Sequence, residues 1–247
     1  MDRREFEIQA QLAGSHWWFS GRRCLVRRLL KSPSGEDRAA LVLDVGCGTG
    51  TMFGALSALG RPVGLDLSPD ALALCRREAP RPLVQATALV LPFADETFSL
   101  VTIFDVLYHQ WVQDDGAVLR ECCRVCQPGG TLLVAEPALE WLRSSHDVVY
   151  HTRRRYTPGE LRGRVAAAAF RVVKSGYANS LLFPGVFLVR LLRRLWPPAP
   201  LSSDLRPVPA RLNRLLTAIS CLEAAAWPHA SFPLGSSALC LARRPLG

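Results

Sequence analysis

Three glycines separated by single residues carry the strongest chemical signal in this 247-residue chain. Gly46, Gly48 and Gly50 follow an aliphatic run, 41–45, that predicts a buried strand, and residues 52–59 favour a helix. A strand that enters a glycine turn at the head of a helix is the usual cradle for a nucleotide-like ligand in open α/β sheets. Glycine suits this turn because the backbone must bend sharply and approach the ligand with no Cβ in the way.

The spacing of the glycines and the acid before them disfavour a dinucleotide. Dinucleotide folds carry G-x-G-x-x-G, whereas the third glycine here comes one residue early and position 51 is threonine. Asp44 lies inside the predicted strand, where its charge would repel a pyrophosphate but could meet a cationic amino group. The turn therefore favours a cationic ligand over one that carries phosphate.

A second acid follows about twenty residues later, at the end of the next predicted strand, 62–66. A carboxylate at this place can accept two hydrogen bonds from a ribose diol, which makes Asp66 a candidate for nucleoside binding. Ser68 and Pro69 then predict the start of a helix, as its cap and its first residue.

Strands and helices alternate along the rest of the chain, which predicts an α/β domain. Residues 113–126 favour a helix that ends at Pro128-Gly129-Gly130. Beyond the first two strands, further strands are expected at 83–87, 99–104, 131–136, 170–174 and 238–242. Leu91-Pro92-Phe93 follows the third strand, 83–87, and Asp105 and His109 follow the fourth, 99–104.

These motifs and their order resemble the class I S-adenosylmethionine-dependent methyltransferases. The resemblance implies a Rossmann-like seven-stranded sheet, mostly parallel with an antiparallel last strand, with helices on both faces and a helical insertion before the last strand. We expect a single domain over 1–247, made of an N-terminal helical lid (1–35), a cofactor-binding core (36–178), the insertion (179–232) and the last strand (233–247).

The same resemblance implies S-adenosyl-L-methionine as the cofactor. The family usually has aspartate where this chain has Thr87, so Thr87 and the Ala88 backbone are expected to replace that contact with the adenine amino group. The residues expected to bind the cofactor are Asp44, Gly46, Cys47, Gly48, Gly50, Asp66, Leu67, Thr87, Ala88 and Asp105.

Two flanking segments narrow the resemblance to a bacterial subgroup. Residues 16–23 read His-Trp-Trp-Phe-Ser-Gly-Arg-Arg, and residues 145–157 contain an Asp/His/Arg-Arg-Tyr loop in which Thr152 stands where the subgroup usually has histidine. Many members occur in the biosynthesis of cell-envelope glycans, lipid-linked compounds or secondary metabolites. The resemblance therefore implies a small-molecule or lipid-linked acceptor, most readily a hydroxyl of an anionic or amphipathic intermediate. The absence of an Asn/Asp-Pro-Pro-Tyr/Phe motif after strand 4 argues against methylation of a base or amide nitrogen.

Histidines after strands 4 and 5 are the candidate general bases. Methyl transfer is an in-line displacement in which the protein aligns the reactants, and a base helps when the acceptor is a hydroxyl. Ligands bind at the carboxyl ends of parallel strands, where these loops emerge. We place His151 and His109 first, with His146 and Asp147 behind them; a loop hydrogen bond is the alternative role for each.

Two clusters are candidates for binding the acceptor. Arg154, Arg155 and Tyr156 suit a phosphate or carboxylate, with a charged loop before the helix that starts at Thr157 as the alternative. A second cluster, Trp17, Trp18 and Phe19, is interpreted as a lid over both ligands, or as core packing for at least one of the three.

The positive charge is concentrated in the second part of the chain. Residues 150–247 hold 15 basic and 3 acidic side chains, whereas residues 1–149 hold 15 basic and 18 acidic ones. An anionic acceptor, an anionic membrane or a general preference for arginine explains this excess. Nucleic acid is disfavoured because stacking aromatics do not alternate with the arginines and a proline-rich stretch, 197–208, interrupts them.

The insertion contains an apolar stretch, 181–196, with Arg190, Arg193 and Arg194 on one predicted helical face. It is too short to span a bilayer, and three alternatives remain: peripheral contact with a membrane surface, a cap over the substrate pocket, or a homodimer interface. The next predicted helix, 209–227, carries an apolar row that we expect to pack as core or lid: Leu212, Leu215, Leu216, Ile219 and Leu222.

The eight cysteines are scattered, which predicts buried thiols in a reducing compartment. Residues 1–15 lack the apolar run of a signal peptide, so we expect a cytoplasmic protein, with a place at the inner face of the membrane as the alternative. Cys123 and Cys126 have no second ligand pair at metal spacing, so no metal is expected.

The cofactor motifs are also compatible with two other functions. One is an enzyme that binds S-adenosylmethionine but catalyses a non-methylating reaction such as cyclisation. The other is a degenerate, non-catalytic binding or scaffold protein.

Overall fold

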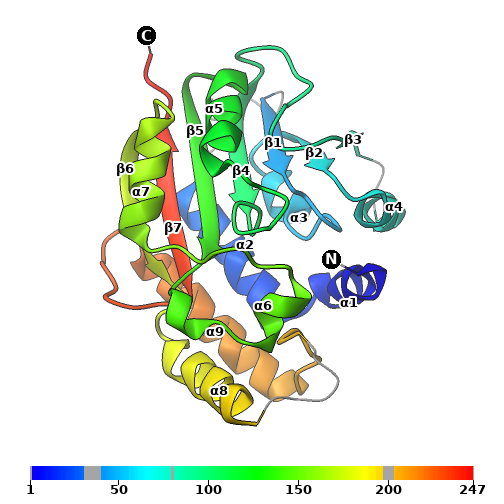
Figure 1. Ribbon diagram of the computed structural model, residues 1–247, viewed down its shortest axis with the longest axis vertical. Coiled ribbons are helices and arrows are strands. Elements are labelled where there is room, and N and C mark those ends of the chain that lie inside the picture. Colours follow the sequence, from blue (N-terminus) through cyan, green and yellow to red (C-terminus); the bar gives the residue numbers. More distant parts are fainter. Residues whose placement is uncertain (1, 31–39, 79–80, 197–202, 247) are drawn as a thin grey trace.

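A seven-stranded sheet forms the centre of the computed structural model, which describes residues 2–30, 40–78, 81–196 and 203–246 (Figure 1). The strand order is β3-β2-β1-β4-β5-β7-β6, with parallel pairing from β3 to β5. β7 runs antiparallel to both β5 and β6. The predicted fold class is confirmed. The strands are β1 (Leu41–Val45), β2 (Arg61–Asp66), β3 (Leu83–Gln85), β4 (Phe98–Phe104), β5 (Cys126–Pro137), β6 (Arg171–Ala178) and β7 (Ser237–Arg243).

The sheet is built around β1 and β4, whose side chains are almost all buried. β4 consists of seven residues that are aliphatic, aromatic or small, which suits a strand covered on both faces. The chain order reverses between β1 and β4, and in open α/β sheets this is where a crevice forms beyond the carboxyl ends of the strands. Asp44 pairs with Thr102 across these two strands.

Helices cover both faces of the sheet and create two hydrophobic cores (Figure 1). One core receives side chains of α5 (Asp115–Val125) and α7 (Pro158–Ala167). The other receives side chains of α2 (Trp17–Leu29), α3 (Phe53–Leu56) and α4 (Pro69–Glu78), together with the buried ring of Trp227. Two of the helices are shorter than predicted: α3 has one turn, and α5 ends at Val125 because β5 begins at Cys126, before the Pro-Gly-Gly sequence.

The remaining helices lie beyond the lower end of the sheet in the view of Figure 1. They are α1 (Arg3–Ala13), the 3-10 turn η1 (Glu140–Leu142), α6 (Ser145–Val149), α8 (Phe183–Leu195) and α9 (Ala210–Ala226). α8 has 13 residues, and within 2–30, 40–78, 81–196 and 203–246 no helix is both long enough and apolar enough to cross a bilayer.

α9 packs through small and polar side chains, not through its row of leucines. Ser220 and Ala224 are buried, whereas Leu215 and Leu222 are exposed, so the core alternative is wrong for these two leucines. The reason is a close approach to α2: a Cβ on Gly21 would lie 2.5 Å from Cβ of Ser220. Only small residues allow two helices to come this near, and the bulkier leucines are left outside. Leu212 and Leu216 of the same row line a cavity, as the lid alternative predicts.

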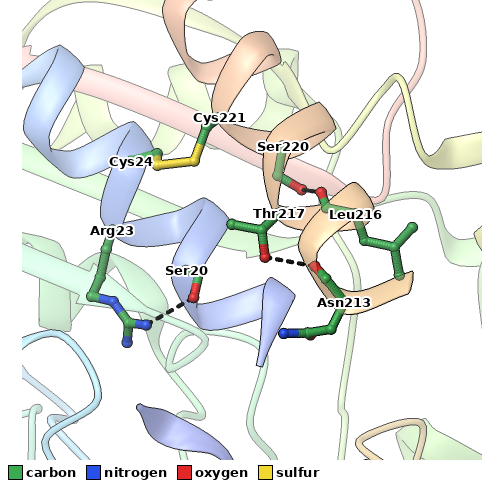
Figure 2. Close-up of a disulfide and its surroundings, with 8 residues drawn as sticks. All are labelled: Ser20, Arg23, Cys24, Asn213, Leu216, Thr217, Ser220 and Cys221. Atoms are coloured by element: carbon green, nitrogen blue, oxygen red, sulfur yellow. Dashed lines mark hydrogen bonds between the residues drawn. A yellow bond between two sulfur atoms is a disulfide. The ribbon is translucent and has the colours of Figure 1, made fainter. Parts of the chain in front are cut away.

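A disulfide joins α2 to α9, two helices that are far apart in the sequence (Figure 2). Figure 2 shows Cys24 bonded to Cys221, beside Ser20 and Thr217. The prediction of eight free thiols is therefore wrong for this pair, because scattered positions in the sequence can still meet in the fold. Of the other six cysteines, Cys123 is half-buried and the rest are buried: Cys47, Cys75, Cys122, Cys126 and Cys240.

Replacing both Cys24 and Cys221 by serine is expected to lower the free energy of unfolding by about 2–4 kcal/mol. The bond closes a long loop, with a sequence separation of 197 residues, and so restricts the unfolded chain. Urea denaturation of the wild type with and without reductant, beside the double variant, measures the effect. The variant should be insensitive to reductant and should match the reduced wild type; equal stability of all samples would contradict a structural role for the bond.

Candidate functional site

A cavity of about 770 Å³ opens at the carboxyl ends of the central strands. Its size lies within the range of small-molecule sites. Segments from across the chain form its wall: the glycine turn, the ends of β2 and β4, and parts of α1, α2, α6, α8 and α9. One space therefore reaches from the predicted cofactor turn to the helices of the insertion.

The glycine turn forms one wall of this cavity. Gly46 has φ +70°, and a Cβ there would overlap Cγ2 of Val106. At Gly48, φ is +54°, and a Cβ would approach Oε1 of Gln9 no closer than 3.9 Å, so the backbone faces open space. Gly50 is different: it does not line the cavity, and a Cβ there would lie 2.7 Å from Sγ of Cys75. Gly46 and Gly48 thus expose backbone to a ligand, while Gly50 allows tight packing behind the turn.

Asp66 holds the turn in shape and also lines the cavity. Its Oδ2 accepts a hydrogen bond from the Gly48 amide at 2.8 Å, and its Oδ1 accepts one from the Ser68 amide at 2.8 Å. Burial raises the pKa of this carboxyl, and the two amides oppose that rise. A ribose diol in the cavity would meet a carboxylate whose position is already determined by two backbone contacts.

Asp44 lies deeper in the cavity wall, at the end of β1. Its side chain is buried, and Thr102 Oγ1 donates a hydrogen bond to Asp44 Oδ1 at 2.7 Å. Burial raises the pKa of Asp44 to about 7. A buried carboxylate of this kind fits a ligand that brings a positive charge, such as the ammonium group of the expected cofactor.

The predicted adenine side is formed by Leu67, Thr87 and Ala88, all of which line the cavity. Leu67 is about half exposed. The hydroxyl of Thr87 accepts a hydrogen bond from the Leu89 amide at 3.2 Å, so it is already engaged in its own turn. Cys47 also lines the cavity, with its side chain buried beneath the turn.

Arg22 is a cavity residue that the sequence reasoning did not single out. Its Nη1 forms an ion pair with Asp105, and its guanidinium lies 5.1 Å from the ring centre of Trp18 and 5.5 Å from that of Phe104. Asp105 itself has φ +57° directly after β4. The available signal was the spacing of Trp18 and Arg22, four residues apart on one helical face.

Glu136 shapes the loop that carries Asp105 and His109, and it too was missed. Its fully buried carboxylate accepts hydrogen bonds from three consecutive amides, those of residues 106, 107 and 108, at 2.9–3.2 Å. Burial, reinforced by the charge of Asp105, raises the pKa of Glu136 to about 8. In the sequence, the only indication that Glu136 organises this loop is its position as an acid at the end of the mainly apolar predicted strand 131–136.

Replacing Glu136 by glutamine is expected to change how stability depends on pH. The pKa in the folded protein is about 8, above the ordinary value of 4.5, so the contribution of this carboxyl to folding is complete below pH 4.5 and is lost as the pH rises through 8. Between about pH 5 and 9 the wild type should lose stability relative to the variant, by on the order of a few kcal/mol. Thermal unfolding across this range measures the difference.

The matched control is Glu121→Gln. Arg124 lowers the pKa of Glu121, so this variant should differ from the wild type in the opposite sense, at acid pH. Parallel curves for wild type and Glu136→Gln across the same pH range would contradict the assignment of Glu136.

Of the predicted histidine bases, His109 and His146 line the cavity and His151 does not. The ring of His151 lies beside Trp111, at 5.6 Å between centres, on a residue with φ +50°. Its neighbour Thr152 faces the cavity in its place. The left-handed backbone at His151 reverses which of the two side chains faces the cavity, and a sequence alone does not predict such a conformation in a loop.

His109 and His146 have different surroundings. Burial lowers the pKa of each to about 4, so both rings are neutral at neutral pH. Nδ1 of His146 accepts a hydrogen bond from the Asp204 amide at 3.0 Å, which leaves the proton of the neutral ring on Nε2. Nδ1 of His109 is buried and has no hydrogen-bond partner in the described part of the chain. Of the two rings, His109 is therefore the one whose unprotonated nitrogen is not already occupied by a backbone amide.

Asp147 and Arg155 form a buried ion pair at the cavity wall. Nε of Arg155 lies 2.8 Å from Oδ1 and its Nη2 lies 3.1 Å from Oδ2. Burial by itself would raise the pKa of Asp147, but Arg155 and the Ser144 amide lower it. Arg155 also donates to the Ala138 carbonyl at 2.8 Å. Both side chains therefore use their hydrogen bonds on each other and on the loop backbone, and we interpret them as residues that stabilise the loop.

Arg154 and Tyr156, the other predicted acceptor residues, lie outside this cavity. The Tyr156 ring is fully buried, and its hydroxyl donates to Asp115 Oδ2 at 2.8 Å. Arg154 lies over that ring at 4.6 Å and forms ion pairs with Asp115 and Glu160. This placement corresponds to the alternative interpretation, a charged loop before the helix that Thr157 caps.

The helices of the lid and the insertion complete the cavity. Trp17, Trp18 and Phe19 all line it, and Phe19 is also buried in the second core. Arg190, predicted to share one helical face with Arg193 and Arg194, points into the cavity: it pairs with Asp204 at 3.2 Å and with Asp147 at 3.5 Å. The two acids supply the countercharge that a buried guanidinium needs.

Comparison with known proteins identifies relatives of the sequence. Residues 43–134 match a family model described as a methyltransferase domain. A probable S-adenosylmethionine-dependent methyltransferase of Mycolicibacterium smegmatis is 31% identical over 166 residues, which cover 65% of this chain and 62% of that protein. The demethylmenaquinone methyltransferase of Shouchella clausii is 34% identical, with 58% and 63% covered. The chain thus spans less than two thirds of the length of these relatives.

Solved structures share the fold over longer stretches. The partner of the Trm112 methyltransferase activator in a complex from Haloferax volcanii matches with a TM-score of 0.63 and 21% identity, covering 99% of this chain and 98% of that one. The [4+2]-cyclase SpnF matches with a TM-score of 0.57 and 20% identity, covering 86% and 77%. At this level of identity the likeness concerns the fold.

Proposed function

Because the chain carries a class I S-adenosylmethionine-dependent methyltransferase domain, we propose that it transfers a methyl group from its cofactor, S-adenosylmethionine, to an amphipathic small molecule or lipid-linked acceptor. The observation that carries this proposal is the single cavity that joins the glycine turn to the apolar walls of α8 and α9. A cofactor and an acceptor that share one space can be aligned for an in-line displacement.

The cofactor half of the cavity contains residues suited to each part of S-adenosylmethionine. We assign Asp44 to the ammonium group, the Gly46–Gly48 backbone to the amino acid end, Asp66 to the ribose, and Thr87 with Ala88 to the adenine. When bound, this cofactor supplies a methyl group already activated by its sulfonium. The protein's own contribution is to align the acceptor and to keep water out.

The acceptor half has an apolar wall and a polar end. Val186 and Val189 of α8 and Leu212 and Leu216 of α9 all line the cavity, and so do the polar side chains His146, Tyr150 and Arg190. Such a site fits a molecule with a polar head and an apolar tail. The name of the Shouchella clausii relative gives demethylmenaquinone as its acceptor, and we take this as support for the same class here.

We place the reacting hydroxyl beside His109. Its ring is neutral at neutral pH and has a nitrogen that can take the proton that the hydroxyl loses, although burial lowers its pKa to about 4 and so makes it a weaker base than a free imidazole. Glu136 holds the loop that carries it, through the three amides of residues 106–108.

Methyl-labelled S-adenosylmethionine, offered with a prenylated naphthoquinol, a phospholipid or a free hexose, tests the acceptor class. Label is expected in an amphipathic acceptor and not in the hexose. Label in the hexose alone, or in none of the three while the cofactor still binds, would contradict this class of acceptor.

Gly185→Leu is expected to reduce transfer to the amphipathic acceptor about tenfold or more, with cofactor affinity unchanged within about twofold. Gly185 lines the cavity, and no atom of the described chain lies within 4 Å of an added Cβ, so leucine would fill the acceptor half without a clash in the backbone. Gly163→Leu on α7 is the matched control, because it is equally unobstructed but does not line the cavity. Equal transfer rates in both variants would argue against an acceptor between α8 and α9.

A non-methylating reaction is the second candidate, favoured by the likeness of the fold to a [4+2]-cyclase. The label experiment separates the two, because a cyclisation would change the substrate and release no S-adenosylhomocysteine. A binding or scaffold protein would leave the substrates unchanged.

For residues 181–196, a peripheral membrane contact and a homodimer interface are alternatives for the same outward surface of α8. A protein partner is recorded for the Haloferax volcanii neighbour, which is in complex with Trm112. A cytoplasmic location remains a prediction.

A further inference from the structure

α8 is apolar on two opposite faces. Its inner face, with Gly185, Val186 and Val189, lines the cavity. Its outer face follows the same helical spacing and is exposed to solvent, with between 39% and 59% of each residue accessible: Phe187, Leu188, Leu191, Leu192 and Leu195. α8 is amphipathic, because it also carries Arg190, Arg193 and Arg194, and the apolar face of such a helix normally packs against other apolar groups. Phe187 has the rings of Trp141 and Phe183 beside it, whereas the leucines of the outer face are exposed to solvent.

A further exposed apolar side chain extends this face: Trp196, directly after the helix, is 73% exposed. α8 and α9 lie at the same end of the molecule (Figure 1). Contiguous apolar surfaces of this kind mark contacts with proteins or membranes.

The charged residues near the outer face of α8 favour a membrane over a second copy of the chain as its partner. Within 179–232 the only acids in the sequence are Asp204 and Glu223. Asp204 pairs with Arg190, and Glu223 is buried, where it accepts a hydrogen bond from the Leu181 amide. Arg194, Arg211 and Arg214, in contrast, are exposed. A second copy of the chain would bring arginines against arginines, whereas anionic headgroups would neutralise them.

We propose that the outer face of α8 lies on an anionic lipid surface. The leucines and Phe187 reach the acyl boundary, Trp196 lies at the headgroup level, and the exposed arginines of α8 and α9 meet the lipid phosphates. The inner face of the same helix would then border a cavity close to the membrane, from which an amphipathic acceptor could enter. The lipid contact itself does not depend on methyl transfer.

Sedimentation of the full chain with lipid vesicles tests this proposal. One set contains phosphatidylcholine alone, and the other contains equal parts of phosphatidylcholine and phosphatidylglycerol. We expect binding to the anionic set, weakening as salt rises, and little binding to the neutral set. The variant Leu188→Glu/Leu192→Glu is expected to bind at least about tenfold more weakly than the wild type.

Val90→Glu/Val173→Glu is the matched control. It adds the same two charges at residues that are exposed by 67% and 54%, neither of which belongs to α8 or lines the cavity. Its vesicle binding should stay within about twofold of the wild type. Titration with S-adenosylmethionine and thermal unfolding verify that both variants are folded, whether or not methyl transfer is found.

Three results would overturn the proposal. The first is that the wild type fails to bind anionic vesicles, and the second is equal loss of binding in both double variants. The third is a dimer, detected by sedimentation equilibrium, that Leu188→Glu/Leu192→Glu abolishes while vesicle binding is absent, which would make the face an interface between copies.

Discussion

Replacing Asp147 by asparagine is expected to lower the free energy of unfolding by about 3–5 kcal/mol. The Asp147 and Arg155 side chains are only 1% and 2% exposed, and they are joined by two charge-assisted hydrogen bonds. Removing one charge would leave the Arg155 guanidinium buried with no countercharge as close, since the nearby Arg190 adds positive charge. The loop between β5 and α7 would lose the contact that holds α6, in its middle, against its last residues.

The pH dependence gives a second readout for this pair. Arg155 lowers the pKa of Asp147 in the folded protein against the effect of burial. The resulting contribution to stability is present above the ordinary pKa of 3.8 and is lost as the pH falls through the lower folded value. Acid unfolding of the wild type should therefore contain a component below about pH 4 that the variant lacks.

Asp95→Asn is the control for both measurements. Asp95 also pairs with an arginine, Arg124 at 2.7 Å, but its side chain is 72% exposed. Water screens such a pair, so its loss should cost less than about 1 kcal/mol. Urea denaturation at neutral pH compares the two variants. If Asp147→Asn and Asp95→Asn lost similar, small amounts of the free energy of unfolding, the buried ion pair would contribute no more to stability than the exposed one.

Asp66→Asn is expected to weaken the binding of S-adenosylmethionine about a hundredfold. Both carboxylate oxygens accept backbone hydrogen bonds, from Gly48 and Ser68. An asparagine has one oxygen and one NH₂ group, so one of the two amides would face a second donor, and the glycine turn would shift. The hydrogen bonds that we propose between residue 66 and the ribose would also weaken. Calorimetric titration with S-adenosylmethionine and S-adenosylhomocysteine measures the change.

Asp70→Asn serves as the matched control, because Asp70 is on the next helix, about half exposed and outside the cavity. Its cofactor affinity should stay within about twofold of the wild type. An unchanged affinity in Asp66→Asn would remove Asp66 from the binding site. If the folded wild type bound neither ligand, the assignment of the whole cofactor half would fail.

The fold class, and the meeting of Asp44, the glycine turn and Asp66 at one cavity, could be predicted from the order of the residues. The signals there are local: Asp44, Gly46 and Gly48 stand within five residues, and a buried strand that enters a glycine turn has few backbone solutions. Asp66 could be placed as well, because the carboxyl ends of neighbouring parallel strands meet at one edge of the sheet. Gly50 shows the limit, since the same spacing did not reveal that its role is packing against Cys75.

The half of the cavity that we propose for the acceptor, in contrast, depends on how distant segments pack. His151 and Thr152 are neighbours, yet only Thr152 lines the cavity, because side-chain direction in a loop depends on contacts far along the chain. Arg190 points inward only because Asp147 and Asp204 are there to meet it. The bond between Cys24 and Cys221 likewise required two helices to pack through Gly21 and Ser220. Local spacing encodes a turn, whereas a cavity wall assembled from distant segments is specified by the packing of the whole chain.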